Sequence, residues 1–392
     1  MRSAVVVGAG MAGLATAGAL ARCGWQVVLL ERGERVAAPP TALVLWPNGR
    51  RALESIDPEG GWSAIANPLP DGGVRRPDGQ WLVAPRGTGT GPAPAAVHLE
   101  DLYDALVAGL GDLVQVRTGF AVTSIRTGTR QRPVISDGGT EIEADLVVAA
   151  DGIDSRIRQA LAPESAAVGS GFAAWQAVIP AYRLPRLTAE HAAGGETLGA
   201  GYRFVSLPLG DRAGGQGGVY WVATAAGAPR PEPPATQLAL LRRWFADWHP
   251  PVGELLAATH ADDLVPQEVR ELRPLPRAYG FPSGPGGVVL LGDAAHAMPH
   301  HLGQGACLAF EDAATLASLV AEAAPGAALT GAIDEYGRLR RPRTTTVVRQ
   351  TRRMSAVVQA RGRLALRARD AALSHMRPRM LGAPAPEWTP PD

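Results

Sequence analysis

Short apolar runs and glycines alternate at the start of the chain. Residues 4–7 are continuously apolar, as in a strand buried on both faces, and a helical pattern follows over 11–22. A second apolar run, over 27–30, ends at Glu31. The whole unit takes about thirty residues, the size of a β–α–β motif. It predicts the first part of a parallel sheet.

Buried-strand runs return near the middle and the end of the chain. They cover 146–150 and 288–291, and an alanine-rich helix is predicted over 305–321. The segments between them predict a helix over 99–110, strands over 114–116 and 120–122, and a hairpin turn at 137–139. Together these elements predict an α/β first domain.

The texture of the sequence changes between residues 165 and 275. Strand-like runs at 203–207 and 219–222 alternate with Gly and Pro breaks, and one helix is predicted over 236–248. Residues 68–96 are also rich in turns, which predicts a hairpin and a loop that leave the first domain. The middle segment therefore predicts a mostly antiparallel sheet inserted into the first domain.

Composition and charge narrow the class of protein. The chain has 392 residues, 46% of them hydrophobic, enough for two domains or for one large domain with an insertion. Basic residues number 38 and acidic residues 37, so the net charge does not indicate a nucleic-acid partner. All basic residues are arginines, which excludes a Schiff-base or P-loop lysine. An arginine-dense stretch over 338–379 predicts a basic helix, which either binds a membrane or nucleic acid or exposes its charges to solvent while its apolar side packs on the body.

The number of cysteines and the N-terminal sequence indicate the cellular compartment of the protein. Cys23 and Cys307 are the only cysteines, too few for a disulfide framework or a metal site. They fit a reducing compartment, and we expect the protein in the cytoplasm. Residues 1–22 superficially resemble a signal peptide, but their glycines favour a strand–turn–helix. No apolar run reaches the roughly 18 residues of a membrane span.

Gly8, Gly10 and Gly13 form a G-x-G-x-x-G loop between the first strand and the first helix. The first glycine allows a tight turn, the second lets the backbone approach a pyrophosphate, and the third lets the helix pack on the strand. Glu31 stands 18 residues after Gly13, close to the about 20 expected for an acid that binds a ribose diol. The spacing predicts a dinucleotide at the N-terminus of the first helix.

Three further segments place polar groups at strand ends or helix starts. Gly292-Asp293 follows a buried strand, where a carboxylate can accept hydrogen bonds from a polyol chain. Gly303-Gln304-Gly305 opens a helix whose free N–H groups suit an electron-rich carbonyl or a ring that becomes anionic on reduction. Asp151-Gly152 also follows a buried strand, and its alternative interpretation is a helix cap.

Together these motifs resemble the class A flavoprotein monooxygenases, the para-hydroxybenzoate hydroxylase-like group, and more closely its salicylate- and urate-hydroxylase branches. The similarity covers roughly residues 1–345 and extends to Trp46-Pro47-Asn48-Gly49 and Glu311-Asp312-Ala313. It implies an FAD site made of Gly8, Gly10, Ala12, Gly13, Glu31, Arg32, Val122, Asp151, Gly292, Asp293, Gly303, Gln304 and Gly305.

The resemblance also implies the domain organisation. The expected fold class is α/β, with a discontinuous Rossmann-like FAD-binding domain, an inserted and mostly antiparallel β-sheet substrate domain, and a C-terminal helical tail. The predicted boundaries are 1–67, 97–165 and 276–345 for the first domain, 68–96 and 166–275 for the second, and 346–392 for the C-terminal helix and tail.

The chemistry implied by the resemblance is oxygen insertion. In this family NADH or NADPH reduces FAD, and O2 then gives a flavin C4a-hydroperoxide that hydroxylates or epoxidises a small to medium aromatic or electron-rich metabolite. Two alternatives stay open: a flavin oxidase or dehydrogenase on the same fold, and a non-catalytic small-molecule binder with weakened FAD affinity. The substrate, the choice between NADH and NADPH, and the oligomeric state are also open.

Three positions depart from the family pattern, and one of them is a family glycine that appears here as Pro40 or Thr41. Leu99 replaces an arginine that helps to hold FAD, which predicts weaker FAD binding. His300 replaces a proline beside the flavin, where an imidazole could act as a general base with an apparent pKa between about 5.5 and 7.5. With Arg203 and Tyr220 on the inserted sheet, His300 completes the predicted catalytic set. The alternatives are a strand-edge ion pair for Arg203, core packing for Tyr220 and an ordinary polar loop residue for His300.

Overall fold

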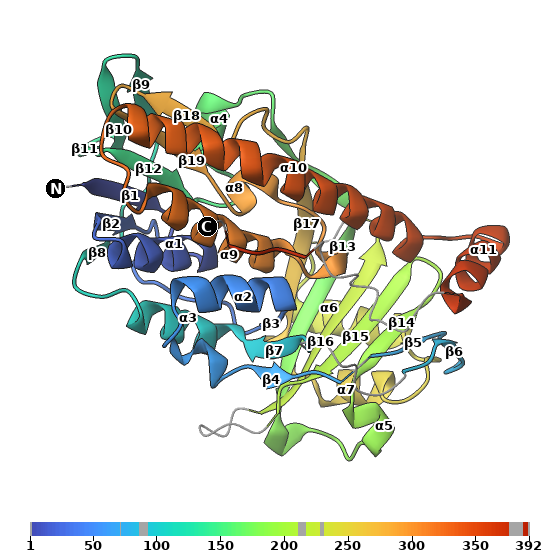
Figure 1. Ribbon diagram of the computed structural model, residues 1–392. Helices are drawn as coiled ribbons and strands as arrows, with labels where there is room; N and C mark the ends of the chain where they lie inside the picture. The colour runs from blue at the N-terminus through green and yellow to red at the C-terminus, as the bar shows by residue number, and fades with distance from the viewer. Residues whose placement is uncertain are drawn as a thin grey trace.

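The computed structural model describes residues 2–70, 72–85, 93–210, 217–227, 231–375 and 387–390, and it contains two large sheets (Figure 1). The first sheet has the strand order β18-β19-β12-β1-β2-β8 and is parallel except for β18, which pairs antiparallel with β19. Every residue of β12 and β19 is buried, as their continuous apolar runs predicted. The strands are β1 (Ser3–Val7), β2 (Gln26–Leu30), β8 (Val114–Arg117), β12 (Leu146–Ala149), β18 (Gly280–Ser283) and β19 (Gly286–Leu290).

Helices surround this sheet and share its core. α1 and α9 lie against each other, and Leu14, Leu20 and Phe310 bury their side chains in the same apolar cluster as the central strands. The parallel sheet with its helices is the predicted α/β domain. The helices are α1 (Met11–Arg22), α2 (Pro47–Ile56), α3 (Leu99–Ala108), α4 (Arg156–Leu161), α8 (Asp293–His296), α9 (Gly305–Val320) and α10 (Ala327–Val358).

The second sheet has the order β17-β13-β16-β15-β14-β5-β6 and is mostly antiparallel, as predicted for the inserted segment. Its strands are β5 (Val74–Arg75), β6 (Trp81–Val83), β13 (Ala166–Pro180), β14 (Gly195–Leu198), β15 (Tyr202–Pro208), β16 (Gly218–Ala226) and β17 (Val265–Arg273). Aromatic side chains, among them Phe204, Trp221 and Phe245, join one face to α6 (Pro234–Trp244) and α7 (Val252–Ala258). The opposite face is free to line a site with the first domain.

Two small sheets and several short helices complete the described part of the chain. The hairpin predicted at 137–139 is confirmed, since β10 and β11 pair antiparallel on either side of it. The small sheets are β3 (Ala42–Leu45), β7 (Ala95–His98) and β4 (Asn67–Pro68), and β11 (Glu141–Glu143), β10 (Gln131–Ser136) and β9 (Ser124–Gly128). The remaining helices are α5 (Ala189–Ala192), α11 (Arg363–Ser374), η1 (Gly61–Ser63), η2 (Ala181–Arg183), η3 (Ala261–Asp263) and η4 (His300–Leu302).

Two element predictions are wrong in detail. Residues 120–122 are not a strand: the Phe120 N–H donates to the Glu31 carbonyl at 2.9 Å, and the next strand, β9, begins only at Ser124. The helix predicted to reach residue 248 ends at Trp244. The excursion at 68–96 does form a hairpin, β5–β6, which extends the second sheet through β14; its residues 86–92 lie outside the described part.

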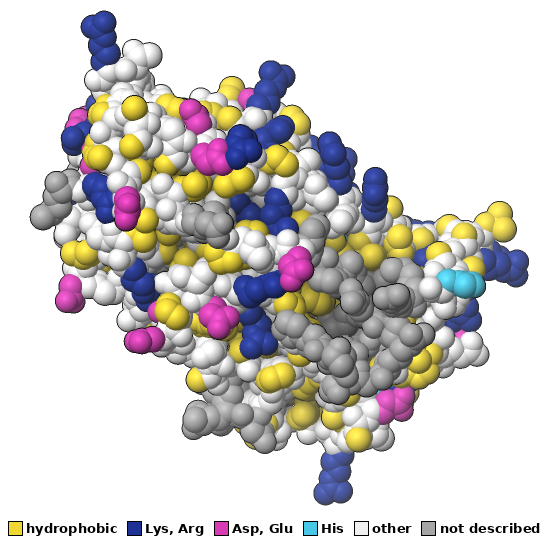
Figure 2. Space-filling model, viewed as in Figure 1, with side chains coloured by type: hydrophobic (Ala, Val, Ile, Leu, Met, Phe, Trp, Pro, Cys, Tyr) yellow, Lys and Arg dark blue, Asp and Glu magenta, His cyan; other side chains and the backbone are white. Residues whose placement is uncertain are grey.

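Along its first half, the arginine-rich C-terminal region matches the second predicted alternative in part, since Arg338 is exposed while Tyr336 on the apolar side packs in the core. α10 runs unbroken through residue 345, so the predicted boundary after that residue falls inside a helix. Arg340 is buried, and Arg352 pairs with Glu271 of β17, so these charges face the body of the protein. Residues 376–386 and 391–392 of the predicted tail lie outside the described part. On the face in Figure 2, basic and acidic side chains are interspersed.

None of the helices in the described ranges combines the length and the apolar composition needed to cross a membrane.

Candidate active site

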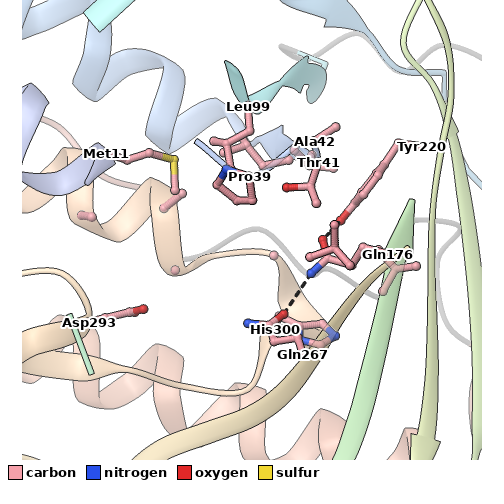
Figure 3. Close-up of a pocket in the computed structure, with 18 of the residues that line it drawn as sticks. Met11, Pro39, Thr41, Ala42, Leu99, Gln176, Tyr220, Gln267, Asp293 and His300 are labelled. Atoms are coloured by element: carbon pink, nitrogen blue, oxygen red, sulfur yellow. Dashed lines mark hydrogen bonds between the residues drawn. The ribbon is translucent and has the colours of Figure 1, made fainter. Parts of the chain in front are cut away.

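A cavity of about 650 Å³ lies between the first domain and the free face of the second sheet. Figure 3 shows Met11 and Leu99 on one side of it, Asp293 and His300 on another, and Tyr220 on the sheet side. The structure therefore brings part of the predicted cofactor and substrate residues to one cavity. Of the predicted set, Gly10, Ala12, Asp293, Gly303, Gly305, Arg203, Tyr220 and His300 line the cavity.

The glycine loop before α1 has the shape that the motif predicts. Gly8 has φ +100°, and a Cβ on Gly13 would lie 1.8 Å from the Gly8 carbonyl oxygen, so both positions require glycine. A Cβ on Gly10 would meet only the Tyr103 hydroxyl, at 3.8 Å, so the backbone is open to the cavity there. Gly10 is also the N-cap and has no side chain to cap the helix. The N-terminus of α1 is therefore available to an anionic group.

A second helix N-terminus opens on the same cavity. α9 has Gln304 as its N-cap without a side-chain cap, and a Cβ on Gly305 would meet no atom within 4 Å. Gly303 has φ +63°, the left-handed conformation that glycine adopts without strain. Two uncapped helix N-termini on one cavity supply N–H groups for a phosphate and for an electron-rich ring. The donor set and the open glycine positions fit FAD.

The Glu31 carboxylate holds the glycine loop before α1 by hydrogen bonds. Its carboxylate accepts hydrogen bonds from the N–H groups of Ala9 and Gly33, each at 2.9 Å. Carboxylate oxygens have further lone pairs, so the ribose contact predicted for Glu31 is compatible with this arrangement. Arg32 is exposed and Val122 is half-buried against the core, and neither lines the cavity. Their assignment to FAD stays a prediction.

Asp293 begins α8 with its carboxylate in the cavity, where a polyol chain can reach it. The protein atoms around it raise the pKa of this carboxyl, while His296 and Arg158 act to lower it, although the residue is exposed to the open cavity. Gly292, with φ +57°, makes the turn that aims Asp293. Asp151 lies at the end of β12 and accepts a hydrogen bond from the Arg156 N–H at 3.0 Å, so it caps the start of α4.

A buried charge network beneath the cavity holds both motif loops. Asp312 accepts hydrogen bonds from the Gly292 N–H at 2.9 Å and from Arg340 at 2.7 Å, and it contacts His296 Nε2 at 2.6 Å. Burial acts to raise the pKa of Asp312, but His296 and Arg340 hold it below its ordinary value. Asn48 donates to Gln304 at 3.0 Å and to Glu311 at 2.7 Å. The network fixes the G-D and G-Q-G segments from below.

Sequence reasoning missed the purpose of this network. Asn48, Glu311 and Asp312 stood in segments that fitted the family pattern, but no role was assigned to them. Arg340 and Arg343, which bind Glu311, were read only as part of a basic helix. A signal was present in the pairing of two acids with two arginines about thirty residues later, although spacing alone does not show which residues meet.

The alternation of side chains along the second sheet places its polar residues in the cavity. Tyr220 donates a hydrogen bond to Gln176 Oε1 at 2.5 Å, and Gln176 Nε2 donates to Gln267 Oε1 at 2.9 Å (Figure 3). Burial raises the pKa of Tyr220. Arg203 forms a buried ion pair with Glu196 of the neighbouring strand β14. An ion pair was the alternative given for Arg203, and the structure contains it in buried form.

His300 lies in η4 at the rim of the cavity, and neither ring nitrogen has a hydrogen-bond partner. Its ring packs edge-on against Phe172, with centroids 5.6 Å apart. Burial, aided by Arg203, lowers the pKa of His300 to about 3. The titration expected between about 5.5 and 7.5 is therefore wrong, because the sequence did not show how enclosed the site is. His301 differs: its Nδ1 contacts Ser355 Oγ at 2.8 Å.

This shift predicts how stability depends on pH. An unfolded imidazole takes up a proton near pH 6.5, whereas His300 stays neutral in the folded protein down to about pH 3. The unfolded state then binds more protons below pH 6.5, so stability is full above that value and falls as the pH drops toward 3. From pH 7 to pH 5 this group costs about 2 kcal/mol. His300→Ala should lose that much less in urea unfolding of the FAD-free protein; parallel losses would refute the buried neutral state.

Leu99 begins α3, is 8% exposed, and lines the cavity near the start of α1. One turn later, the Tyr103 hydroxyl lies 3.8 Å from the position of a Cβ on Gly10, so a neutral group occupies part of the space around that helix end. No charge-assisted contact comes from Leu99. The weaker FAD binding expected from Leu99 stays a prediction, and substitution of Leu99 tests it.

Leu99→Arg should tighten FAD binding by about ten- to a hundredfold, because a charge-assisted hydrogen bond contributes about 1.5–3 kcal/mol. Quenching of flavin fluorescence on titration of the FAD-free protein measures the change. Leu99→Met is the size-matched control without charge and should bind as the wild type does. Equal affinity of the arginine variant and the wild type would contradict the argument.

The fold and the site define a class of protein. One dinucleotide loop, a strand-end aspartate and a second open helix N-terminus share a cavity with an inserted substrate sheet, as in the class A FAD-dependent monooxygenases of the para-hydroxybenzoate hydroxylase type. Residues 1–351 match the family model described as FAD binding domain. The chain belongs to this family and is an FAD-dependent monooxygenase.

Individual relatives agree with this class. The chain is 33% identical over 324 residues to 2-heptyl-3-hydroxy-4(1H)-quinolone synthase of Pseudomonas aeruginosa, covering 80% of each chain. It is 29% identical over 364 residues to the aurachin C monooxygenase/isomerase of Stigmatella aurantiaca, covering 91% of this chain and 89% of the relative. The structure of Klebsiella pneumoniae HpxO complexed with FAD and uric acid has the same fold, with a TM-score of 0.80, 24% identity, and coverage of 96% and 93%.

Proposed function

We propose that this monooxygenase takes electrons from NADH or NADPH and inserts one oxygen atom of O2 into a small or medium-sized aromatic or otherwise electron-rich metabolite. The second oxygen atom leaves as water. The observation that carries the proposal is the single cavity that joins two open helix N-termini to the polar face of the second sheet. Relatives named for a quinolone, 3-hydroxybenzoate and urate support an aromatic substrate.

In the proposed reaction, the chain binds and orients its cofactor through fixed groups. The N-terminus of α1 would hold the phosphates, Asp293 would accept hydrogen bonds from the polyol chain, and the N-terminus of α9 would face the ring. Bound FAD would supply the electron transfer and the oxygen chemistry. The buried network under Gly292 and Gln304 keeps these groups in place without rearrangement.

The residues opposite would position the substrate. Tyr220, Gln176 and Gln267 form a connected hydrogen-bonding row, and the neutral His300 can donate through one nitrogen and accept through the other. With a pKa of about 3, His300 is a weak base at neutral pH, so we assign it a hydrogen bond to the substrate in place of proton removal.

His300→Ala should lower the rate of product formation at least about tenfold, since one lost hydrogen bond to a buried group costs on the order of 1–3 kcal/mol. FAD affinity should change little, because the groups of the neighbouring Gly303 to Gly305 segment that would meet the cofactor are backbone N–H groups, which the substitution keeps. The ratio of product formed to NAD(P)H consumed measures the effect, with His375→Ala, at an exposed site, as the control. An unchanged ratio and rate would leave Arg203 and Tyr220 as the better candidates.

The proposed function is tested on the FAD-loaded protein with NADH and NADPH in turn. Aromatic and heteroaromatic compounds are screened for stimulated oxidation of the donor under ¹⁸O2, and the product is weighed by mass spectrometry. Incorporation of one labelled atom supports a monooxygenase. Hydrogen peroxide in place of labelled product would indicate a flavin oxidase, and binding without donor oxidation would indicate a binder. The free thiols of Cys23 and Cys307 support a cytoplasmic location, and the oligomeric state stays open.

A further inference from the structure

The only arginine among the described residues that line the cavity already has its charge neutralised. Arg203 is 7% exposed, and its Nε contacts Glu196 Oε1, while Glu196 itself is 1% exposed. The guanidinium of Arg203 also donates a hydrogen bond from Nη2 to the His301 carbonyl oxygen, at 3.4 Å. A substrate anion could bind Arg203 only in competition with a buried carboxylate, which would be left without its counter-charge.

The other polar groups on the substrate side carry no charge. Tyr220 is protonated because burial raises its pKa, and Gln176 and Gln267 are neutral amides in the same hydrogen-bonded row. His300 and His301 are neutral at physiological pH because burial lowers the pKa of each. Apart from Arg203, the charged residue among the described lining of the cavity is Asp293, which is an acid. Nothing on this side offers an unpaired positive charge among the described residues.

Much of the remaining wall is apolar. On the second sheet, Val205 and Val222 lie opposite each other, as do Leu207 and Tyr220, and all four face the cavity. Ala42 and Val44 of β3 pack in the same apolar cluster and line the cavity as well. A buried carboxylate on such a wall would lose its hydration without compensation. An apolar substituent would gain from the same wall by leaving water.

We infer that the substrate is an uncharged aromatic or heteroaromatic molecule, with a ring donor or acceptor for the Gln176–Gln267 row and His300 and an apolar substituent against the valine and leucine wall, and that carboxylate-bearing aromatics are selected against. This inference rests on the proposed function and specifies its substrate class. Discrimination arises because Glu196 pairs with Arg203, the one arginine that the described lining offers to an anionic substrate.

Matched pairs of compounds test the inference on the FAD-loaded wild-type protein. Salicylamide is compared with salicylate, and 4-hydroxyquinoline with its 2-carboxylate, because each pair shares a ring and differs in charge at pH 7.5. Dissociation constants come from the perturbation of the flavin absorbance spectrum. The uncharged member of at least one pair should bind at least tenfold more tightly than its anion. Equal or tighter binding of both anions, or no binding of any of the four compounds, would overturn the inference.

Substitution of Glu196 tests the cause. Glu196→Gln should free the charge of Arg203 and shift the preference toward the anion by about ten- to a hundredfold. Glu190→Gln is the matched control: it removes an exposed acid that pairs with Arg75 and should leave the preference unchanged. If Glu196→Gln fails to fold, the double variant Arg203→Gln with Glu196→Gln removes both charges. The preference for the uncharged compound should then persist, and a further tenfold loss of anion binding would show that Arg203 serves anions in the wild type.

The substrate preference and the oxygen insertion are measured separately. Labelled oxygen in an anionic compound that binds best would overturn the inference and leave the monooxygenase function standing. Tight binding of an uncharged compound without oxygen incorporation would support the selectivity and refute the proposed reaction on that compound.

Discussion

Gly10→Val should abolish detectable FAD binding while the protein stays folded. The backbone at Gly10 is extended, a conformation that valine adopts readily, so the substitution strains no turn. A Cβ there meets only the Tyr103 hydroxyl at 3.8 Å, and the branched side chain would therefore project into the open cavity at the N-terminus of α1. That is where the N–H groups would meet the pyrophosphate. A loss of at least about a hundredfold, near 3 kcal/mol, is expected.

The neighbouring glycines define the controls for this experiment. Gly13→Val would place a Cβ 1.8 Å from the Gly8 carbonyl oxygen, so that variant should unfold and cannot report on the cofactor. Gly253→Val, in α7, adds the same side chain in open space away from the cavity and should bind FAD normally. Flavin fluorescence quenching gives the affinity, and circular dichroism melting shows that the fold survives. A Gly10 variant that melts normally and binds FAD as the wild type does would remove this loop from the site.

Local signals predicted the first sheet because its strands carry their own evidence. β12 and β19 are continuous apolar runs, and Gly8 and Gly13 beside α1 are required by close backbone contacts. The segment at 120–122 looked the same locally but pairs with the loop after β2, so burial there does not come from a strand ladder. Pattern alone cannot separate these two cases.

Contacts between distant segments were beyond the reach of the sequence. Gln176 and Gln267 are 91 residues apart and meet only because β13 and β17 pair. Nothing local distinguishes either glutamine from a surface residue. His300 was placed correctly at the cavity, but its environment was not, because the enclosure that lowers its pKa is made by the second sheet and η4 together.

The arginines of α10 are a second case in which contacts between distant segments decide the role of a residue. Arg338 and Arg340 stand two residues apart in α10, and the sequence alone does not distinguish a buried arginine from an exposed one at these positions. Arg338 is exposed and pairs with Glu335 on its own helix, whereas Arg340 is 1% exposed and bridges Glu311 and Asp312 of α9. Only the position of α9 decides which arginine turns inward.

Arg340→Met should therefore destabilise the protein by about 3–5 kcal/mol, the usual cost of removing one partner from a buried ion pair. Methionine fills part of the space but leaves Glu311 and Asp312 with less compensation, and the loops that carry Gly292 and Gln304 lose their support from below. We expect both a lower urea midpoint and weaker FAD binding. Arg338→Met removes the same charge from the same helix at an exposed site and should change neither.

Comparison of Arg340→Met with Arg338→Met distinguishes two roles of α10, a basic surface and a support for the flavin site. If α10 served mainly as a basic surface, both substitutions would have similar and small effects on stability and on FAD affinity. If α10 instead supports the flavin site, only Arg340→Met reduces stability and FAD affinity. The loss of FAD affinity is then larger than the fraction of unfolded protein explains. FAD titration in a stabilising osmolyte separates the two contributions, because an osmolyte restores folding but not the position of Gly292. A full recovery of FAD affinity in the osmolyte would show that Arg340 acts on stability alone.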